Sequence, residues 1–447
     1  MNSPEKLPAG QKILSLAKES WAVSWPMTII MFFMFLIGLA DVYVAGRINT
    51  EIQAAYGVSS QLYFIFSIIA FALTVGTVSL TSQLYTSGRE KDFIDSVDSS
   101  LTVAMLSGIV FSVIGFALAR PIIQSMHIPY ILKEKAVVLL RIYSTGLVFT
   151  YILTCTNGIL RASGRIWKSL FTMAVVCILN TVLNFTLAFK TPLGFMGIGI
   201  ATVISVSAGC VLNLLFMRPF VTALFQFSPA AVRKIIGIGW PAGLLQIFWQ
   251  LGAMVLYLIL AALPANAIET MAAFTNGIKI ESAIFLPAFA FNMANAVLIG
   301  NLLGKKNYRD AFSTGIVTAF SGVFIVLILT LLVMLNARAI ASLLSNNQVV
   351  IEECARYIRI ALLFEPIMAW AVILGGALNG AGDTKTVMLV VAFCIWIVRV
   401  PISYLFALKF GLGAAAVWWA MNFSLLAQSI LISRRYFSKR WIFKALT

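Results

Sequence analysis

Charged side chains are scarce in this chain of 447 residues. Asp, Glu, Lys and Arg together make up 11% of the sequence, whereas 61% of the residues are hydrophobic and the mean hydropathy is +0.96. So few polar groups cannot coat the surface of a water-soluble globule of this size. The composition therefore excludes a soluble globular protein and predicts a polytopic membrane protein.

Histidine and closely spaced cysteines are almost absent. The single histidine is His127, and the five cysteines lie far apart, so neither a disulfide framework nor a metal-binding cluster is indicated. A membrane-embedded enzyme would need a nucleophile with a base, or a set of metal ligands, inside the apolar segments. The sequence offers neither, and we expect no catalytic residues, no metal and no cofactor.

A compact basic patch is also missing, although the formal net charge is +16. The Lys and Arg residues are scattered over short loops without interleaved aromatic residues, which argues against nucleic-acid binding. Under the span assignment below, twenty of these 32 residues lie on the side of the termini and ten on the opposite side. This asymmetry predicts a multi-pass protein of the cell (inner) membrane with both termini cytoplasmic.

Long apolar runs, by contrast, are plentiful. Windows of about 20 apolar residues predict twelve transmembrane helices, and no alternating strand pattern is present. Because every backbone amide in lipid must be satisfied within its own segment, the predicted fold class is all-α. The predicted spans cover roughly residues 24–46, 55–82, 97–120, 136–159, 167–189, 195–217, 236–262, 272–300, 312–337, 358–381, 386–408 and 413–433.

The second half of the sequence repeats the first. Three motif pairs carry the repeat: "SWPMTII" at 24–30 with "GWPAGLL" at 239–245, "QAAYGVS" at 53–59 with "MAAFTNG" at 271–277, and "NGILRASG" at 157–164 with "GGALNGAG" at 375–382. Their offsets stay between 215 and 218 residues, and each repeat holds six helices, an even number. The pattern predicts two pseudo-symmetric six-helix lobes, residues 1–218 and 219–447, related by an axis along the membrane normal.

These motifs, together with "DVYVAG" at 41–46 and "FLPAFAFNMANAVLIGNLLGKK" at 285–306, resemble those of the multidrug and toxic compound extrusion (MATE) transporters. The resemblance covers essentially the whole chain. It implies two six-helix bundles around a central cavity that opens alternately to either side, and export of small organic cations in exchange for H⁺ or Na⁺. We expect a monomer.

Five ionisable residues fall inside the predicted spans: Asp41, Lys279, Glu281, Glu365 and Arg399. In the second lobe, Lys279 and Arg399 can pair with Glu281 and Glu365, which is the cheapest way to keep such groups in a low dielectric. Asp41 is left without a basic partner in its own lobe. Such a carboxylate is expected to be protonated or to hold a mobile cation, which makes it a candidate ion-coupling site; the alternative is a purely structural hydrogen bond.

Polar partners for Asp41 are visible in "LNTVLNFTL". Asn180 and Asn184 are four residues apart and share one face of the fifth helix. In one branch of the resembled family, the first-lobe site consists of an Asp in helix one, an Asn and an Asp one turn apart in helix five, and a Thr in helix six. The resemblance maps these positions to Asp41, Asn180, Asn184 and Thr202. Asn184 departs from this pattern, because a second carboxylate is expected there, and the departure leaves both H⁺ and Na⁺ open.

Three further residues have both a functional and a structural interpretation. Glu365 precedes Pro366 near the predicted start of helix ten, where it is either a second-lobe coupling group or an interfacial helix-end residue. Glu281 is either a coupling group or one member of a structural ion pair. Asn157 precedes the glycines of helix four, and either faces the substrate cavity or bonds to a neighbouring helix.

The alternatives to an antiporter are a flippase and a channel. A flippase for lipid-linked oligosaccharides belongs to the same superfamily, but such proteins usually carry several cationic side chains in the cavity, and only Lys279 and Arg399 are available here. A channel is disfavoured, because two duplicated lobes with an off-centre acid suit rocking better than a fixed pore.

Overall fold

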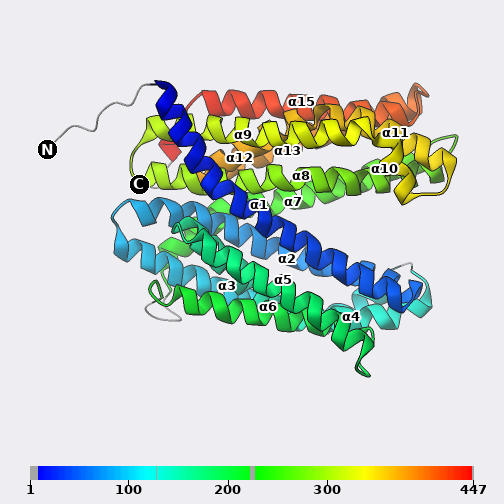
Figure 1. The fold of residues 1–447 in the computed structure, drawn as a ribbon, viewed down its shortest axis with the longest axis horizontal. Coiled ribbons are helices and arrows are strands. Elements are labelled where there is room, and N and C mark those ends of the chain that lie inside the picture. The colour runs from blue at the N-terminus through cyan, green and yellow to red at the C-terminus, as the bar shows by residue number, and fades with distance from the viewer. Residues whose placement is uncertain (1–8, 127, 222–226, 445–447) are drawn as a thin grey trace. The chain divides into compact units, whose positions relative to one another are not determined.

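The computed structural model describes residues 9–126, 128–221 and 227–444, so His127 lies outside the described residues. Within these ranges the chain is all-helical, without a strand, and twelve helical segments are long and apolar enough to cross a membrane (Figure 1). All twelve match the predicted spans, although most begin or end several residues beyond the predicted limits. The all-α fold class is therefore confirmed.

The first half contains one helix per span: α1 (Ala9–Ile48), α2 (Thr50–Thr86), α3 (Glu90–Ser125), α4 (Tyr130–Ala162), α5 (Ile166–Phe189) and α6 (Met196–Met217). The second half contains α7 (Pro229–Ala261), α8 (Ala267–Gly304), α9 (Tyr308–Leu335), α10 (Ala337–Leu344), α11 (Gln348–Ala361), η1 (Leu362–Phe364), α12 (Glu365–Gly380), α13 (Thr384–Phe393), η2 (Cys394–Arg399), α14 (Val400–Tyr404), η3 (Leu405–Lys409), α15 (Ala414–Phe437) and η4 (Ile442–Lys444).

Two spans of the second half are built from several helical pieces. Span ten joins α11, η1 and α12 into Gln348–Gly380, and span eleven joins α13, η2, α14 and η3 into Thr384–Lys409. In span eleven, Pro401 cannot donate a backbone hydrogen bond to the carbonyl four residues earlier, which is a physical reason for the wider π-type turn of η2. Arg399 is the last residue of that turn.

The repeated glycine motif ends a helix in the same way in both halves. Gly164 after α4 has a φ of 72°, and Gly382 after α12 has a φ of 83°, a left-handed conformation that favours glycine. The next residue then bonds back into the helix: Arg165 N donates to the Leu160 carbonyl at 2.8 Å, and Asp383 N donates to the Leu378 carbonyl at 2.8 Å. These two glycines thus end α4 and α12.

The chain packs as two compact units whose limits fall inside helices. One unit is Ile29–Gly243, and the other combines Met1–Thr28 with Leu244–Thr447. Each limit follows a helix-interior proline by two residues, Pro26 in α1 and Pro241 in α7. The predicted lobe boundary between residues 218 and 219 lies in the α6–α7 connection, part of which is outside the described residues, and it stays a prediction.

Contacts at the beginning of α1 explain why this segment belongs to the unit of the second half. Lys12 pairs with Asp310 of α9 at 2.5 Å, and Ser20 Oγ donates to Thr318 Oγ1 of α9 at 2.9 Å. The beginning of α7 belongs to the other unit for a similar reason. Gly76 of α2 packs so closely on the Ile235 carbonyl that an added Cβ would come within 2.1 Å of its oxygen.

Candidate functional site

Asp41 is a buried acid of α1, with 4% of its surface exposed; Asp98 of α3 is a second buried acid of the first half. Its Oδ1 accepts a hydrogen bond from Asn184 Nδ2, and its Oδ2 accepts longer bonds from Tyr56 Oη at 3.4 Å and Thr202 Oγ1 at 3.5 Å. None of the ion pairs among the described residues involves Asp41. Three neutral donors from α2, α5 and α6 thus converge on one carboxyl group of α1.

The polar residues predicted around Asp41 form one connected network. Asn180 and Asn184 lie on the same face of α5, and Asn184 Nδ2 also donates to Asn180 Oδ1 at 3.1 Å. Asn180 Nδ2 donates in turn to Thr202 Oγ1 of α6 at 3.2 Å. The structure therefore brings together all four residues of the predicted first-lobe set, and their function stays a prediction.

One oxygen of this network is left without a partner. Asn184 Oδ1 is buried and has no hydrogen-bond partner within the described parts of the chain, while its amide nitrogen faces Asp41. An ionised carboxylate only accepts hydrogen bonds, whereas a protonated one also donates. Rotation of the Asn184 amide exchanges its nitrogen and oxygen, so this side chain can match either state of Asp41. A cation would instead be bound by the carboxylate, amide and hydroxyl oxygens, the ligand types that hard cations prefer.

Tyr56 is a member of the site that the sequence did not reveal. Its hydroxyl reaches Asp41 from the first turns of α2, and its ring lies 6.4 Å from that of Tyr143 on α4. A tyrosine within an apolar helix is usually a packing residue. Only the contact of its hydroxyl with Asp41 distinguishes Tyr56 from such a residue. The nearest signal was its position in the repeated motif "QAAYGVS".

A second group of ionisable residues lies in the unit of the second half. Glu281 of α8 accepts a hydrogen bond from the Tyr357 hydroxyl of α11 and interacts electrostatically with Arg399. Arg399 Nε donates to Ser424 Oγ of α15 at 2.8 Å, and its guanidinium lies 5.4 Å from the ring centre of Trp249 on α7. No ion pair between Glu281 and Arg399 is present among the described residues, and Tyr357 makes the direct bond to the acid.

Glu365 is the first residue of α12 and directly follows η1, close to the helix-end position that the sequence predicts. The helical segment that contains it is longer than predicted, because it begins at Gln348, ten residues before the predicted start. The Glu365 side chain is 1% exposed, and neither carboxyl oxygen has a hydrogen-bond partner among the described residues. Its two interpretations, a coupling group and an interfacial helix-end residue, stay predictions.

Lys279 does not join this group. It lies on an exposed face of α8, and no ion pair among the described residues includes it. A direct pair of Lys279 with Glu281 is not expected, because residues two positions apart on a helix point to different faces. The possible pair of Lys279 with Glu365 does not occur among the described residues, because Lys279 is exposed and Glu365 is buried.

Asn157 of α4 is buried and bonded to two neighbouring helices. Its Oδ1 accepts from Ser169 Oγ of α5 at 2.8 Å and from Asn213 Nδ2 of α6 at 3.0 Å, and its amide lies 3.4 Å from Met173 Sδ. These contacts fit the alternative interpretation, a polar bond between helices. A contact of Asn157 with substrate stays a prediction.

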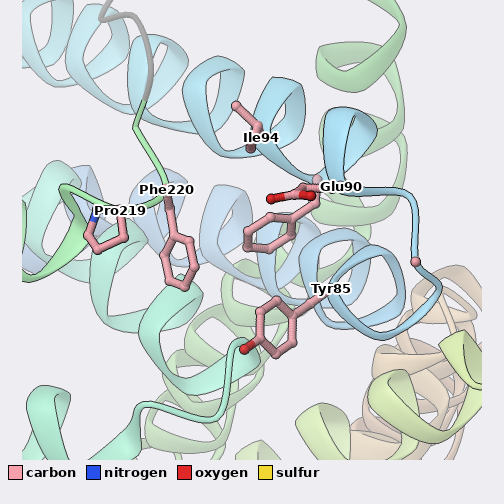
Figure 2. Close-up of a pocket in the computed structure, with 7 residues that line it drawn as sticks. Tyr85, Glu90, Ile94, Pro219 and Phe220 are labelled. Atoms are coloured by element: carbon pink, nitrogen blue, oxygen red, sulfur yellow. The ribbon is translucent and has the colours of Figure 1, made fainter.

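A pocket of about 310 Å³ lies at the α2–α3 turn and contains none of the predicted residues. Figure 2 shows Tyr85, Glu90 and Phe220 around it, with Pro219 and Ile94. The Phe93 ring lies 5.3 Å from Tyr85 and 5.4 Å from Phe220, and the Arg165 guanidinium covers Phe220 at 4.1 Å. The pocket is an aromatic cluster with one acid, separate from the Asp41 network.

Comparison with known proteins adds two kinds of similarity. The family model described as MatE matches the chain twice, over residues 26–186 and 241–405, and the two matches start 215 residues apart, as the sequence repeat predicts. The "Uncharacterized transporter YisQ" of Bacillus subtilis is 25% identical over 95% of both chains. The "Probable multidrug resistance protein NorM" of Thermotoga maritima is 22% identical over 91% of this chain and 89% of that protein.

Solved structures show the same fold. A transporter of the MOP superfamily from Pyrococcus furiosus, for which a different function was suggested from the reversed polarity of its binding pocket, aligns with a TM-score of 0.89. It is 20% identical and the alignment covers 98% of this chain and 100% of that one. The outward-facing conformation of a multidrug resistance MATE family transporter gives 0.89 at 21% identity, over 98% and 100%.

Proposed function

Since this chain belongs to the MATE family of multi-pass membrane transporters, we propose that it is a secondary antiporter that exports organic cations in exchange for H⁺. The observation that carries the proposal is the Asp41 network: one buried carboxyl group, three neutral donors and no ion-pair partner. Two relatives of this chain are named "Probable multidrug resistance protein NorM", which also supports multidrug export.

Proton coupling is favoured over Na⁺ coupling by the composition of this network. Asp41 is its single carboxylate, and the other members, Asn180, Asn184, Thr202 and Tyr56, are neutral. Taking a metal cation from water requires several oxygen ligands with enough negative charge, whereas a proton needs one carboxylate and an acceptor for its hydrogen bond. Asn184 Oδ1, which has no partner, is that acceptor once the amide rotates.

Alternating access is supported by the way the units divide the chain. The limits after Pro26 and Pro241 divide α1 and α7, so each of these two helices belongs partly to one unit and partly to the other. Proline removes one backbone hydrogen bond and permits bending at these points. Asp41 lies on α1, which is one of the two divided helices. A change in the protonation of Asp41 can therefore affect the bending of this helix.

The oligosaccharide flippase is the weaker candidate. Of its two expected cavity cations, Arg399 is bonded to Ser424 and associated with Glu281, and Lys279 stands alone. The proposed transporter is a monomer without enzymatic activity. Both termini are proposed to be cytoplasmic, as the distribution of Lys and Arg predicts.

The test is substrate efflux from proteoliposomes with a pH gradient or a Na⁺ gradient imposed separately. We expect the pH gradient alone to drive efflux in the wild type. Asn184→Asp restores a second carboxylate and is expected to add dependence on Na⁺, while Asn213→Asp, at a buried amide bonded to Asn157, serves as the matched control. Efflux of the wild type with Na⁺ alone would contradict proton coupling.

A further inference from the structure

The pocket at the α2–α3 turn has no part in the Asp41 network. Its volume is about 310 Å³, and it is lined by the end of α2, the beginning of α3 and the connection that follows α6. Sites for small molecules are typically concave and have volumes of about 300 to 1,000 Å³. The pocket is therefore large enough for a small organic ligand.

Three aromatic rings meet in this pocket at steep angles. The Tyr85 ring is inclined by 54° to the Phe93 ring and by 78° to the Phe220 ring. The Phe93 and Phe220 rings are inclined by 87° to each other. Phe93 is buried, whereas Tyr85 is 42% exposed. Rings at such angles form a corner instead of a stack, and the negative face of an aromatic ring attracts a cation.

Glu90 gives the pocket its charge. It is the one Asp, Glu, Lys or Arg among the described residues that line the pocket, and Figure 2 shows its carboxylate turned toward the side where Phe220 lies. Neither this carboxylate nor the Tyr85 hydroxyl has a hydrogen bond or an ion pair within the described part of the chain. A carboxylate only accepts hydrogen bonds, so it matches a ligand that donates them, such as an ammonium group.

Two arginines near the pocket are held by other groups. Arg89 pairs with Asp92 at 3.7 Å. The Arg165 guanidinium covers Phe220 at 4.1 Å, and its Nη1 donates to a carbonyl oxygen of α6 at 3.5 Å. Neither arginine lines the pocket. The Glu90 carboxylate is thus left to a ligand, and its charge favours a cationic one.

Glu90 also lies in the first turn of α3, where an acid stabilises a helix through the helix dipole. Asp92 lies in the same turn and can act on the helix in the same way. Asp92 does not line the pocket, whereas Glu90 does. Stabilisation of the helix therefore explains an acid at either position, but it does not explain the aromatic rings beside Glu90.

We propose that this pocket is a binding site for an aromatic organic ammonium ion. The ammonium group is bound by the Glu90 carboxylate, and the aromatic part lies against the rings of Tyr85 and Phe220. In the arrangement of twelve spans the α2–α3 turn lies on the side of the termini, from which an exporter takes up its substrate. The pocket then holds a cation before export; this role rests on the proposed function, whereas binding does not.

Protection of a cysteine placed in the pocket tests binding directly. Ile94 lines the pocket and the five native cysteines are buried, so a maleimide should label Ile94→Cys selectively in the purified full-length protein. Phenyltrimethylammonium should slow this labelling, whereas benzoate, an aromatic anion, should not. Asp92→Cys, in the same helix but outside the pocket, should react equally fast with and without the cation. If Ile94→Cys reacts too slowly, Pro219→Cys at an exposed lining position gives the same measurement.

The contribution of Glu90 is measured in the same cysteine background. Glu90→Gln should raise the phenyltrimethylammonium concentration that gives half-maximal protection by about two- to fivefold, as expected for one exposed charge pair. Asp92→Asn removes the same charge outside the pocket and should leave this concentration unchanged. Both acids are exposed, so both variants should fold. Absence of protection, or equal protection with and without the Glu90 carboxylate, would overturn the proposal.

The role in export has its own measurement. In proteoliposomes, Glu90→Gln should raise the substrate concentration that gives half-maximal efflux, and Asp92→Asn should not. Unchanged efflux by Glu90→Gln, in spite of weaker protection, would overturn the role in export and leave the binding site. Absence of gradient-driven efflux in the wild type would contradict the proposed function alone, because protection is measured without transport.

Discussion

The two halves of this protein share a backbone plan and differ in how they bury acid. In the first half, Asp41 accepts three hydrogen bonds from neutral side chains, whereas Glu365 in the second half accepts none from the described residues and interacts electrostatically with a second acid, Glu281. By the motif offset of 218 residues, the position equivalent to Glu365 is the buried Leu147. The two repeats thus share their helices but not the positions of these acids.

The features that the halves do share are backbone features. Pro26 and Pro241 lie at equivalent positions inside the first helix of each repeat, and Gly164 and Gly382 end the fourth. These residues act through a missing hydrogen bond donor or a left-handed conformation, not through a partner side chain. Such features survive when the surrounding side chains change.

A first test concerns the division of the first helices. Ser20 Oγ and Thr318 Oγ1 are 2.9 Å apart, so a Ser20→Cys, Thr318→Cys pair is within reach of a disulfide, and the five native cysteines are buried and unpaired. Both residues belong to the unit that contains Leu244–Thr447, so fixing the beginning of α1 to α9 should leave export at the wild-type rate. Export that stops on cross-linking and returns with a reductant would show that this contact must break during the cycle.

Arg399 tests how much a buried charged residue of the second half contributes to stability. Arg399→Gln should lower the free energy of unfolding by about 1 to 3 kcal/mol, because it removes the buried hydrogen bond to Ser424 and the contact with Trp249. Lys279→Gln is the matched control, since Lys279 is exposed on the same α8 helix as Glu281 and should melt like the wild type. Thermal unfolding in detergent measures both, and equal melting of the two variants would refute the assignment.

A smaller effect tests the similarity of the halves. An added Cβ meets no atom within 4 Å at Gly164, and Gly382 has a similar left-handed φ, so alanine at either position adds the strain of that conformation. We expect Gly164→Ala and Gly382→Ala each to destabilise the protein by about 1 to 2 kcal/mol. The melting temperatures of the two variants measure this loss of stability. A loss in only one of the two variants would show that the two helix ends are not equivalent.

Hydropathy and repetition in the sequence were enough to predict the twelve spans. The same hydropathy misplaced the start of span ten, because the charges of "QVVIEECARYIRI" end the apolar window although the helix continues. The grouping of Asp41 with Asn180, Asn184 and Thr202 came from the family resemblance. Tyr56 and Tyr357 could not be predicted, because their hydroxyls matter only once distant helices pack.

Gradient-driven efflux by Asp41→Asn in proteoliposomes tests the central claim most directly. The amide is nearly isosteric and removes a buried charge, so the variant should fold, yet it can neither gain nor lose a proton. We predict that a pH gradient no longer drives export, while a cationic substrate still binds to the purified protein. Export at the wild-type rate from folded Asp41→Asn would contradict the account and move the coupling site to Glu281 and Glu365.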